Sequence, residues 1–309
     1  MARKVSVGGQ AVIEGVMMRG SSSIATAVRK SDGDIEVSVE KFTPYTKRNR
    51  IFGLPVVRGF VALIESLVIG INALNKSAEY FEDEVEETKL DAWFKSVFKE
   101  KSNAVVNAIT LMIALAAAVG LFFILPTFAA SIFVYAGIKD PFALNIFEGL
   151  IRVGIFLLYV FLIGKMEDIH RVFQYHGAEH KAIFCYENDR PLTAENAGDF
   201  GRLHPRCGTN FMFLVMIVSI IVFSMTGWET LWSRIVSRVI LLPVVSGITY
   251  ELIKWMGRSN SKMSQMLSYP GLMLQKLTTR EPDIDQIEVA IAALKAAEGI
   301  TEDGEYNVQ

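Results

Sequence analysis

Long apolar runs alternate with polar segments along the chain and predict its main elements. Ala104 to Leu125 carries no charged residue and ends at Pro126, so it has the length and composition of a membrane-spanning helix. Similar runs predict further spans at about 142–164, 211–226 and 239–255. The pattern therefore indicates a mainly α, polytopic membrane protein with about four transmembrane helices.

Residues 1–50 show a different pattern, in which apolar and polar side chains alternate and valine and glycine are abundant. Alternation with a period of two is typical of half-buried strands, and clusters of serine, aspartate and glycine separate the runs. We expect strands at 5–7, 11–18, 24–28 and 35–40. The segment predicts a small N-terminal antiparallel β element in the cytosol. No apolar stretch follows the charged start, so we expect no cleavable signal peptide.

The run from Leu54 to Leu74 has membrane length but carries Arg58, Glu65 and Asn72 at steps of seven. This spacing places the three polar residues on one helical face, and a span that faces lipid all round does not accommodate such a stripe. We expect a helix that lies in the membrane interface. A re-entrant piece, or a span whose polar face packs against protein, are the alternatives. Residues 51–103 then hold interfacial and amphipathic helices and an acidic connector.

Prolines predict interruptions in the later segments. Pro243 and Gly247 break the last predicted span, and Pro270 interrupts an amphipathic stretch that follows it. A final helix is expected at 283–297, where apolar residues recur on one face. Residues 257–309 are therefore interpreted as cytosolic amphipathic helices.

The net charge of −2 conceals an uneven distribution of charged residues. The two short connections between spans hold Lys139, Arg234 and Arg238 as their only basic residues. By the positive-inside rule, both termini and a histidine-rich loop at 165–210 then face the cytosol. Residues 104–256 are the membrane domain, which contains this loop. No polybasic tract indicates binding to nucleic acid.

The candidate chemistry lies in that loop, because all four histidines and both cysteines fall between His170 and Cys207. If the segment is helical, His176 and His180 stand on one face and reach a single metal ion. With Glu179 they match the H-x-x-E-H pattern of inverted zinc proteases, in which both histidines bind zinc and the glutamate acts as general base. We expect a divalent metal, zinc, as the cofactor.

Further ligands are expected nearby in the fold. His204 and Cys207 lie in one short turn and supply an imidazole and a thiolate, which zinc accepts. Glu251, near the cytosolic end of the last span, is a candidate for the distant glutamate that completes the protease sites. His170 falls on another helical face, which indicates an interfacial or supporting role. For Cys207, a packed free thiol is an equal alternative, and Cys185 is expected to be one.

A second group of charged residues is compatible with a polar pocket or with structural roles. If His176 and His180 bind no metal, they would hydrogen-bond backbone or lipid headgroups instead, and Arg206 would anchor phosphates. The group comprises Glu14, Arg19, Arg58, Glu65 and Arg206.

Several long motifs carry a resemblance to a known family. They are Gly8 to Arg19, Tyr175 to Lys181, Leu203 to Phe211, and the stretch from Pro270 to Pro282. Together they resemble the YqhQ family (DUF1385) of bacterial membrane proteins, which is of unknown function and is often described as a predicted metal-dependent enzyme. The resemblance implies a multi-pass protein of the bacterial cytoplasmic membrane.

The sequence supports two functional hypotheses. The first is a metal-dependent membrane enzyme that hydrolyses its substrate at the cytosolic face of the lipid bilayer, with Glu179 as the base. The second is a non-catalytic transporter, sensor or scaffold, in which Glu148, Arg152 and Glu251 line a path or a helix interface. The number of spans is small for a transporter, and a homo-oligomer would supply further helices.

Overall fold

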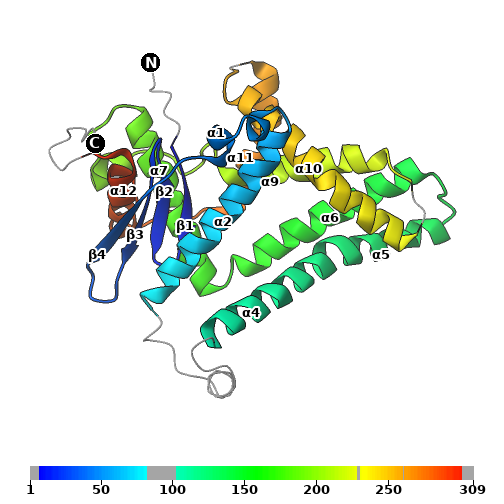
Figure 1. The fold of residues 1–309 in the computed structure, drawn as a ribbon, viewed down its shortest axis with the longest axis horizontal. Coiled ribbons are helices and arrows are strands. Elements are labelled where there is room, and N and C mark those ends of the chain that lie inside the picture. Colours follow the sequence, from blue (N-terminus) through cyan, green and yellow to red (C-terminus); the bar gives the residue numbers. More distant parts are fainter. Residues whose placement is uncertain (1–6, 82–101, 228–229, 260, 301–309) are drawn as a thin grey trace. The chain divides into compact units, whose positions relative to one another are not determined.

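The computed structural model describes residues 7–81, 102–227, 230–259 and 261–300 (Figure 1). The chain forms two compact units. The first comprises the described residues of Met1–Tyr80, Val160–Val218 and Leu241–Gln309, and the second those of Phe81–Tyr159 and Ser219–Ile240. The predicted acidic connector lies mostly outside the described residues.

The first unit contains one antiparallel sheet, which confirms the predicted N-terminal β element. Its strands follow one another in space as in sequence: β1 (Gly8–Val12), β2 (Gly15–Arg19), β3 (Ser23–Arg29) and β4 (Ile35–Lys41). The run 11–18 is not one strand as expected, because Ile13 and Glu14 form a two-residue turn within it. Glu14, the second residue of the turn, has a φ of 47°, in the left-handed region, where a type II turn places its second central residue.

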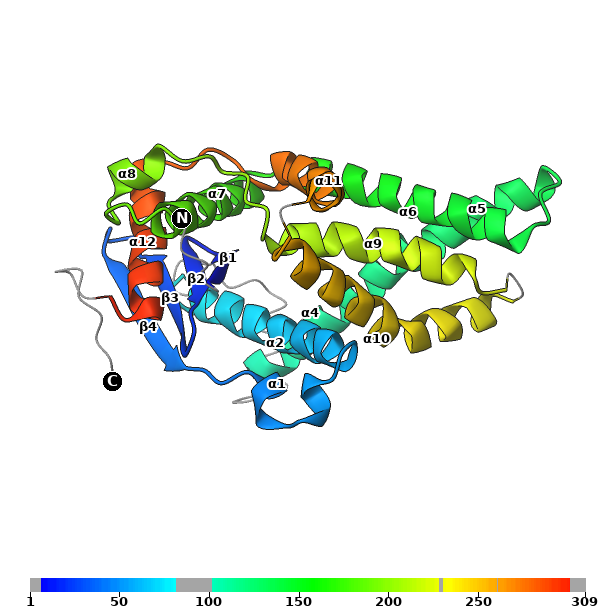
Figure 2. The same cartoon turned by 90° about the horizontal axis from the view of Figure 1, so that it is seen from above.

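Helices cover both faces of this sheet (Figure 2). On one face α7 (Glu167–Glu187) and α12 (Ile284–Glu298) enclose the main apolar core with inward residues of β2 and β3. Many core residues are alanines, which let helix and strand backbones approach closely. The final helix predicted at 283–297 is confirmed, and a capping box between Asp283 and Gln286 closes its N-terminus.

The opposite face of the sheet packs against α2 (Val57–Glu79). Arg19 points to this side of β2 and donates a hydrogen bond to the buried carboxylate of Glu65 at 3.0 Å. The backbone N–H of Tyr45 donates to the same carboxylate at 2.7 Å. Glu65, one of the three residues of the polar stripe noted in the sequence, therefore faces protein.

The remaining helices complete the first unit and build the second. They are α1 (Tyr45–Arg48), η1 (Ile51–Gly53), α4 (Ser102–Val119), η4 (Gly120–Ile124), α5 (Leu125–Tyr135), α6 (Pro141–Ile163), α8 (Ala194–Gly198), α9 (Gly208–Ser224), α10 (Leu231–Met256) and α11 (Lys262–Thr278).

Within the described residues, four helical segments are long and apolar enough to cross a membrane, which is the predicted number: Val57–Glu79, Ile109–Tyr135, Pro141–Ile163 and Trp232–Met256. One of these four segments is not among the predicted spans. The predicted span at 211–226 lies in the shorter apolar helix α9, whereas α2 reaches spanning length. Because α2 also packs on the sheet and exposes Leu67 and Ile71, its expected interfacial position stays a prediction.

Pro126 does not end its helix, contrary to the sequence-based expectation. The chain continues from α4 through one π-helical turn, η4, into α5. Proline offers no N–H to the carbonyl of Phe122 four residues before it. The guanidinium of Arg152 donates Nε–H to that oxygen at 2.8 Å, so a side chain from α6 replaces the missing backbone donor.

Two other expected breaks are also wrong, because α10 continues through Pro243 and α11 continues through Pro270. The nearby glycines serve packing. A Cβ on Gly247 would lie 2.8 Å from the Cα of Val56, and one on Gly271 would lie 3.0 Å from the Cα of Asn210. These glycines allow close approach of other segments, which the sequence alone does not distinguish from helix interruption.

Arg234 and Arg238 do not lie in an external connection as expected, because α10 begins at Leu231 and contains both. Both are buried beside Glu148 of α6. Arg238 donates to the Glu148 carboxylate at 2.7 Å, and Arg152 donates to it at 2.5 Å. One carboxylate thus holds guanidinium groups from two helices of the second unit.

Replacing Glu148 with Gln is expected to lower the free energy of unfolding of the second unit by about 3–5 kcal/mol, because it leaves buried guanidinium groups without their anion. Thermal unfolding in detergent measures the loss. Asp140→Asn is the matched control, since Asp140 caps the N-terminus of α6 through Ala143 and asparagine caps equally well. Equal melting temperatures for the two variants would show that the Glu148 cluster carries little stability.

Candidate metal centre

One face of α7 carries the histidines of the H-x-x-E-H motif. Glu167 and Asp168 occupy the first helical turn, where negative charge favours helix formation. The helix places His176 and His180 one turn apart, with ring centroids 4.5 Å from each other. The core-facing residues Tyr175, Ala178 and Ala182 lie on another side of the same helix, so the sheet fixes how the two histidines are presented.

The opposite wall of the centre is the turn that precedes α9. Cys207 lies in this turn, and its position is set by the neighbouring helix α11. Gln275 of α11 accepts a hydrogen bond from the backbone N–H of His204 and donates one to its carbonyl, both at 2.8 Å. Asn210 donates to the carbonyl of Pro205 at 3.1 Å and closes the turn.

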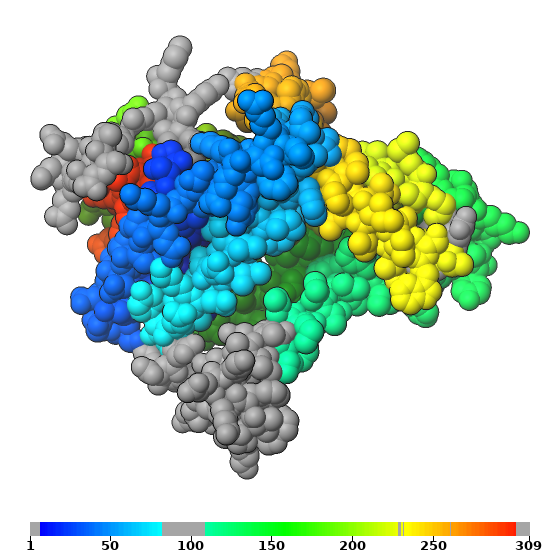
Figure 3. All heavy atoms as spheres, viewed as in Figure 1, coloured from blue at the N-terminus to red at the C-terminus, as the bar shows by residue number. Residues whose placement is uncertain are grey.

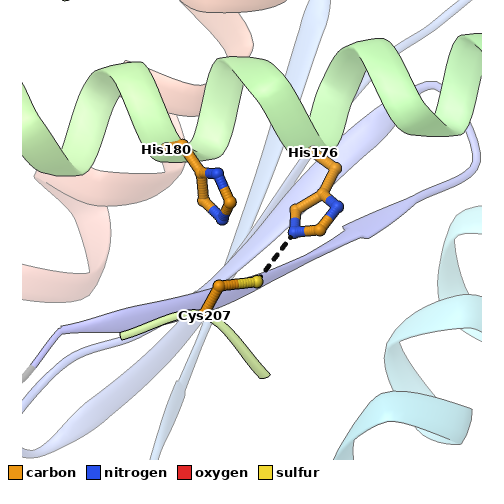
Figure 4. A group of neighbouring side chains, drawn as sticks. All are labelled: His176, His180 and Cys207. Atoms are coloured by element: carbon orange, nitrogen blue, oxygen red, sulfur yellow. Dashed lines mark hydrogen bonds between the residues drawn. The ribbon is translucent and has the colours of Figure 1, made fainter. Parts of the chain in front are cut away.

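His176, His180 and Cys207 form the candidate metal centre (Figure 4). Their potential ligand atoms all lie within 4.8 Å of one another, and Nε2 of His176 is 3.1 Å from Sγ of Cys207. His180 is buried and the other two are half-buried. Figure 4 shows both rings pointing from the helix toward the sulfur. These separations suit ligands that share one small cation.

The second nitrogen of each ring fixes its tautomer. Nδ1 of His176 donates to the carbonyl of Thr278 at 2.8 Å, and Nδ1 of His180 donates to the carbonyl of Arg202 at 2.5 Å. A carbonyl only accepts, so each Nδ1 carries the proton and each Nε2 presents a lone pair toward the centre. Backbone anchoring of this kind is typical of metal-binding histidines.

Electrostatics favour the neutral form of the more buried ring. Burial lowers the pKa of His180, and the neighbouring Cys207 opposes this effect only in part. Neutral imidazole is the form that binds a metal. Among the described residues, Nε2 of His180 receives no hydrogen bond although it is buried. A cation at this point would satisfy that nitrogen.

Glu179 lies between the metal-facing and core-facing sides of α7 and is buried. Burial raises the pKa of its carboxyl group, while His176, His204 and the backbone N–H of Gly9 lower it by smaller amounts. Gly9 leaves space for this side chain, because a Cβ there would lie 2.9 Å from Cδ of Glu179. A buried carboxyl group beside two histidines is placed where it could exchange a proton with a neighbouring group.

His204 lies beside the centre but does not join the group of three. Its ring centroid is 5.7 Å from that of His180. Nδ1 of His204 accepts from the backbone N–H of Arg206 at 3.3 Å, so Nε2 carries the proton and donates to Glu187 at 3.3 Å. Arg206 also pairs with Glu187. The ring therefore orders the turn that presents Cys207, with both of its nitrogens occupied.

The other predicted site residues lie in separate ion pairs. Glu251 forms a two-pronged pair with Arg58 of α2 and is absent from the group of three. Glu14 pairs with Arg171, and Arg19 pairs with Glu65. The described structure does not gather them into one pocket. His170 is exposed on α7.

Several supporting groups were absent from the sequence-based set. They are backbone carbonyls or distant side chains, which carry no local signal: Arg202, Thr278, Gln275 and Glu187. Gly177 is an exception, because a glycine in the middle of the motif helix marks a close approach. A Cβ there would overlap the carbonyl oxygen of Arg280. The segment after α11 thus runs against α7, with Arg280 N–H donating to Phe173 O at 2.8 Å.

Comparison with known proteins identifies relatives over most of the chain. The family model described as a protein of unknown function (DUF1385) matches residues 54–299. The Bacillus subtilis (strain 168) protein named Uncharacterized protein YqhQ is 36% identical over 293 residues, which cover 92% of this chain and 89% of that protein. No solved structure matches. The candidate centre lies within the matched residues.

Replacing Gly177 with Ala is expected to destabilise the first unit by about 1–3 kcal/mol, because a backbone oxygen occupies the space that the methyl group needs. The control is Gly154→Ala in α6, where nothing lies within 4 Å and alanine should stabilise the helix by about 1 kcal/mol. Thermal unfolding of both variants shows whether each substitution lowers or raises the stability of the protein. A stabilising Gly177→Ala would contradict the close packing against Arg280.

The two cysteines are expected to differ in reactivity. Burial raises the pKa of the Cys185 thiol, so little reactive thiolate forms, whereas Cys207 is half-buried. Iodoacetamide should modify Cys207 in the folded, metal-stripped protein and Cys185 only after denaturation, as read by peptide mass spectrometry. Added zinc should slow modification of Cys207. Equal labelling of both thiols in the folded protein would contradict this placement.

Proposed function

The chain belongs to the DUF1385 family, whose function is unknown, and we propose that it is a zinc-dependent membrane hydrolase with His176, His180 and Cys207 as its metal ligands. The observation that carries the proposal is the convergence of three donor atoms within 4.8 Å, two of them on rings whose other nitrogen is anchored to backbone. Scattered structural histidines rarely satisfy both conditions.

The donor set favours zinc. Imidazole nitrogen and thiolate sulfur are ligands that zinc accepts, and a site with three protein ligands keeps a fourth position open, as in catalytic zinc sites. A bound zinc ion supplies a Lewis acid that polarises a carbonyl or phosphoryl oxygen. The backbone N–H of Thr209 donates to Sγ of Cys207 at 3.4 Å, which stabilises negative charge on the sulfur.

Glu179 is the proposed general base. Its carboxyl group is buried close enough to His176 for the ring to lower its pKa, while burial raises that pKa more strongly. The carboxylate is suited to accept a proton from water and to pass it to a leaving group. Gly9 of β1 holds it from the other side, so the sheet contributes directly to the position of the base.

We place this centre at the cytosolic face of the cytoplasmic membrane, with both termini in the cytosol. The support is the distribution of lysine and arginine. Because Arg234 and Arg238 lie in helix α10 and are buried with Glu148, Lys139 is the only basic residue that the predicted external connections retain within the described part of the chain. Association of copies is not needed for the centre, since all three donors come from one chain.

The transport hypothesis receives no specific support from the described ion pairs. Glu65, Glu148 and Glu251 each have an arginine partner, as expected for polar groups that hold helices and sheet together. We therefore develop the hydrolase proposal alone.

Metal content tests the ligand set. Elemental mass spectrometry of the detergent-purified protein should give about one zinc per chain. His176→Ala, His180→Ala and Cys207→Ser should each lose most of it, because two remaining ligands bind zinc weakly. Glu251→Gln is the control and should retain the metal, since Glu251 pairs with Arg58. Zinc retained by all the ligand variants would contradict the proposal.

Glu179→Gln separates the base from the ligands. The variant should keep its zinc and its fold, because glutamine has nearly the same shape as glutamate, but lose hydrolytic activity by about 100-fold or more. A screen of peptide, ester and phosphoester substrates with the parent supplies the assay. Loss of zinc in Glu179→Gln would make Glu179 a ligand, and full activity would remove its role as base.

A further inference from the structure

Helix α11 carries an exposed apolar stripe that the candidate centre does not use. Met263, Met266 and Tyr269 are all more than half exposed, at 59%, 71% and 59%. Met263 and Met266 begin a stripe with helical spacing along α11, and its later members, Pro270, Met273 and Leu277, are half-buried. Large apolar side chains that recur on one helical face call for an apolar partner.

The other sides of α11 have different characters. The buried side, at Ser264, Gly271 and Gln275, packs on the turn that carries Cys207. The exposed polar side carries Gln265 and Lys276, and Lys262 lies at the border between this side and the methionines. The helix thus has a protein side, a polar side and an unpartnered apolar side. Figure 3 shows α11, coloured orange, at the surface of the molecule.

The start of α11 is tied to the end of a membrane-length helix. Only a few residues separate Met256, the last residue of α10, from Lys262. The hydroxyl of Ser264 donates to the carbonyl of Met256 at 3.0 Å, so the first turn of α11 lies against the last turn of α10. Trp255 at this end is 40% exposed, and tryptophan is enriched at membrane interfaces.

The charge of this region matches an anionic lipid surface. From residue 254 to 280 the sequence contains no aspartate or glutamate. It does contain basic residues on and around α11: Lys254, Arg258, Lys262, Lys276 and Arg280. Basic residues beside an apolar helical face are typical of helices that lie in the headgroup region of anionic membranes.

We propose that α11 lies in the membrane surface, with its methionine stripe among the acyl chains and its lysines at anionic phospholipid headgroups. Since Gln275 and Thr278 of the same helix hold the Cys207 turn and the His176 ring, the bilayer contact fixes the height of the centre above the lipid. Substrate would then reach the centre at the bilayer surface. The lipid contact itself does not depend on the proposed hydrolase activity.

Nitroxide labels at two adjacent positions test the proposal. Met266→Cys places the label on the stripe, and Gln265→Cys places it on the polar side about 100° away around the helix. Both residues are exposed, so neither change disturbs the core.

The full-length protein is reconstituted in vesicles of phosphatidylglycerol and phosphatidylcholine. Power saturation then gives access to oxygen, which concentrates in lipid, and to a water-soluble nickel chelate. The parent, treated with the same label, supplies the background from native thiols.

The label at 266 should be accessible to oxygen and screened from nickel, and the label at 265 should show the reverse, so the depth parameter changes sign between neighbours. Nickel access at both positions would put the stripe in water and overturn the proposal. Protection of 266 from both reagents would indicate contact with protein, such as a second copy of the chain, and would also overturn it. In vesicles of phosphatidylcholine alone the contrast should shrink, and an unchanged contrast would remove the anionic lipid from the proposal. Neither readout requires bound metal, so a failure here is distinguishable from failure of the hydrolase.

Discussion

The candidate centre depends on two hydrogen bonds that run from histidine rings to backbone carbonyls. Without them, each imidazole of α7 would be free to rotate or to change tautomer, and the two Nε2 lone pairs would not converge on Cys207. The acceptor carbonyls belong to Thr278 and Arg202, on two separate segments packed against α7. The fold around α7 therefore serves to bring these two carbonyls and one sulfur to the same helical face.

Each layer of the first unit contributes to that arrangement. The alanine-rich core between the sheet and α7 fixes the rotation of the helix, and Gly177 lets the chain after α11 approach it. Helix α11 holds the Cys207 turn on one side and faces lipid, in our proposal, on another. The centre is thus built between the sheet and the helix proposed to rest on the bilayer. This arrangement would couple the position of the ligands to the membrane surface.

Much of the architecture follows from local pattern, because strand alternation and apolar length report directly on sheets and spans. The antiparallel sheet, the number of span-length helices and the final helix were predictable for this reason. The prolines at 126, 243 and 270 were misjudged, since distant groups such as Arg152 compensate locally unfavourable residues. Partners of the histidines were invisible for the same reason: His176 and Thr278 are 102 residues apart, and a carbonyl acceptor can belong to any residue type.

X-ray absorption at the zinc edge of the purified protein tests the central claim most directly, because it reports the atoms around the metal itself. The account predicts two nitrogen neighbours at about 2.0–2.1 Å and one sulfur at about 2.3 Å, with one lighter atom completing the shell. Cys207→Ser is expected to lose most of its zinc, and any zinc that this variant retains should show no sulfur neighbour. A zinc ion surrounded only by oxygen and nitrogen in the parent protein would contradict the assignment of His176, His180 and Cys207 as one metal centre.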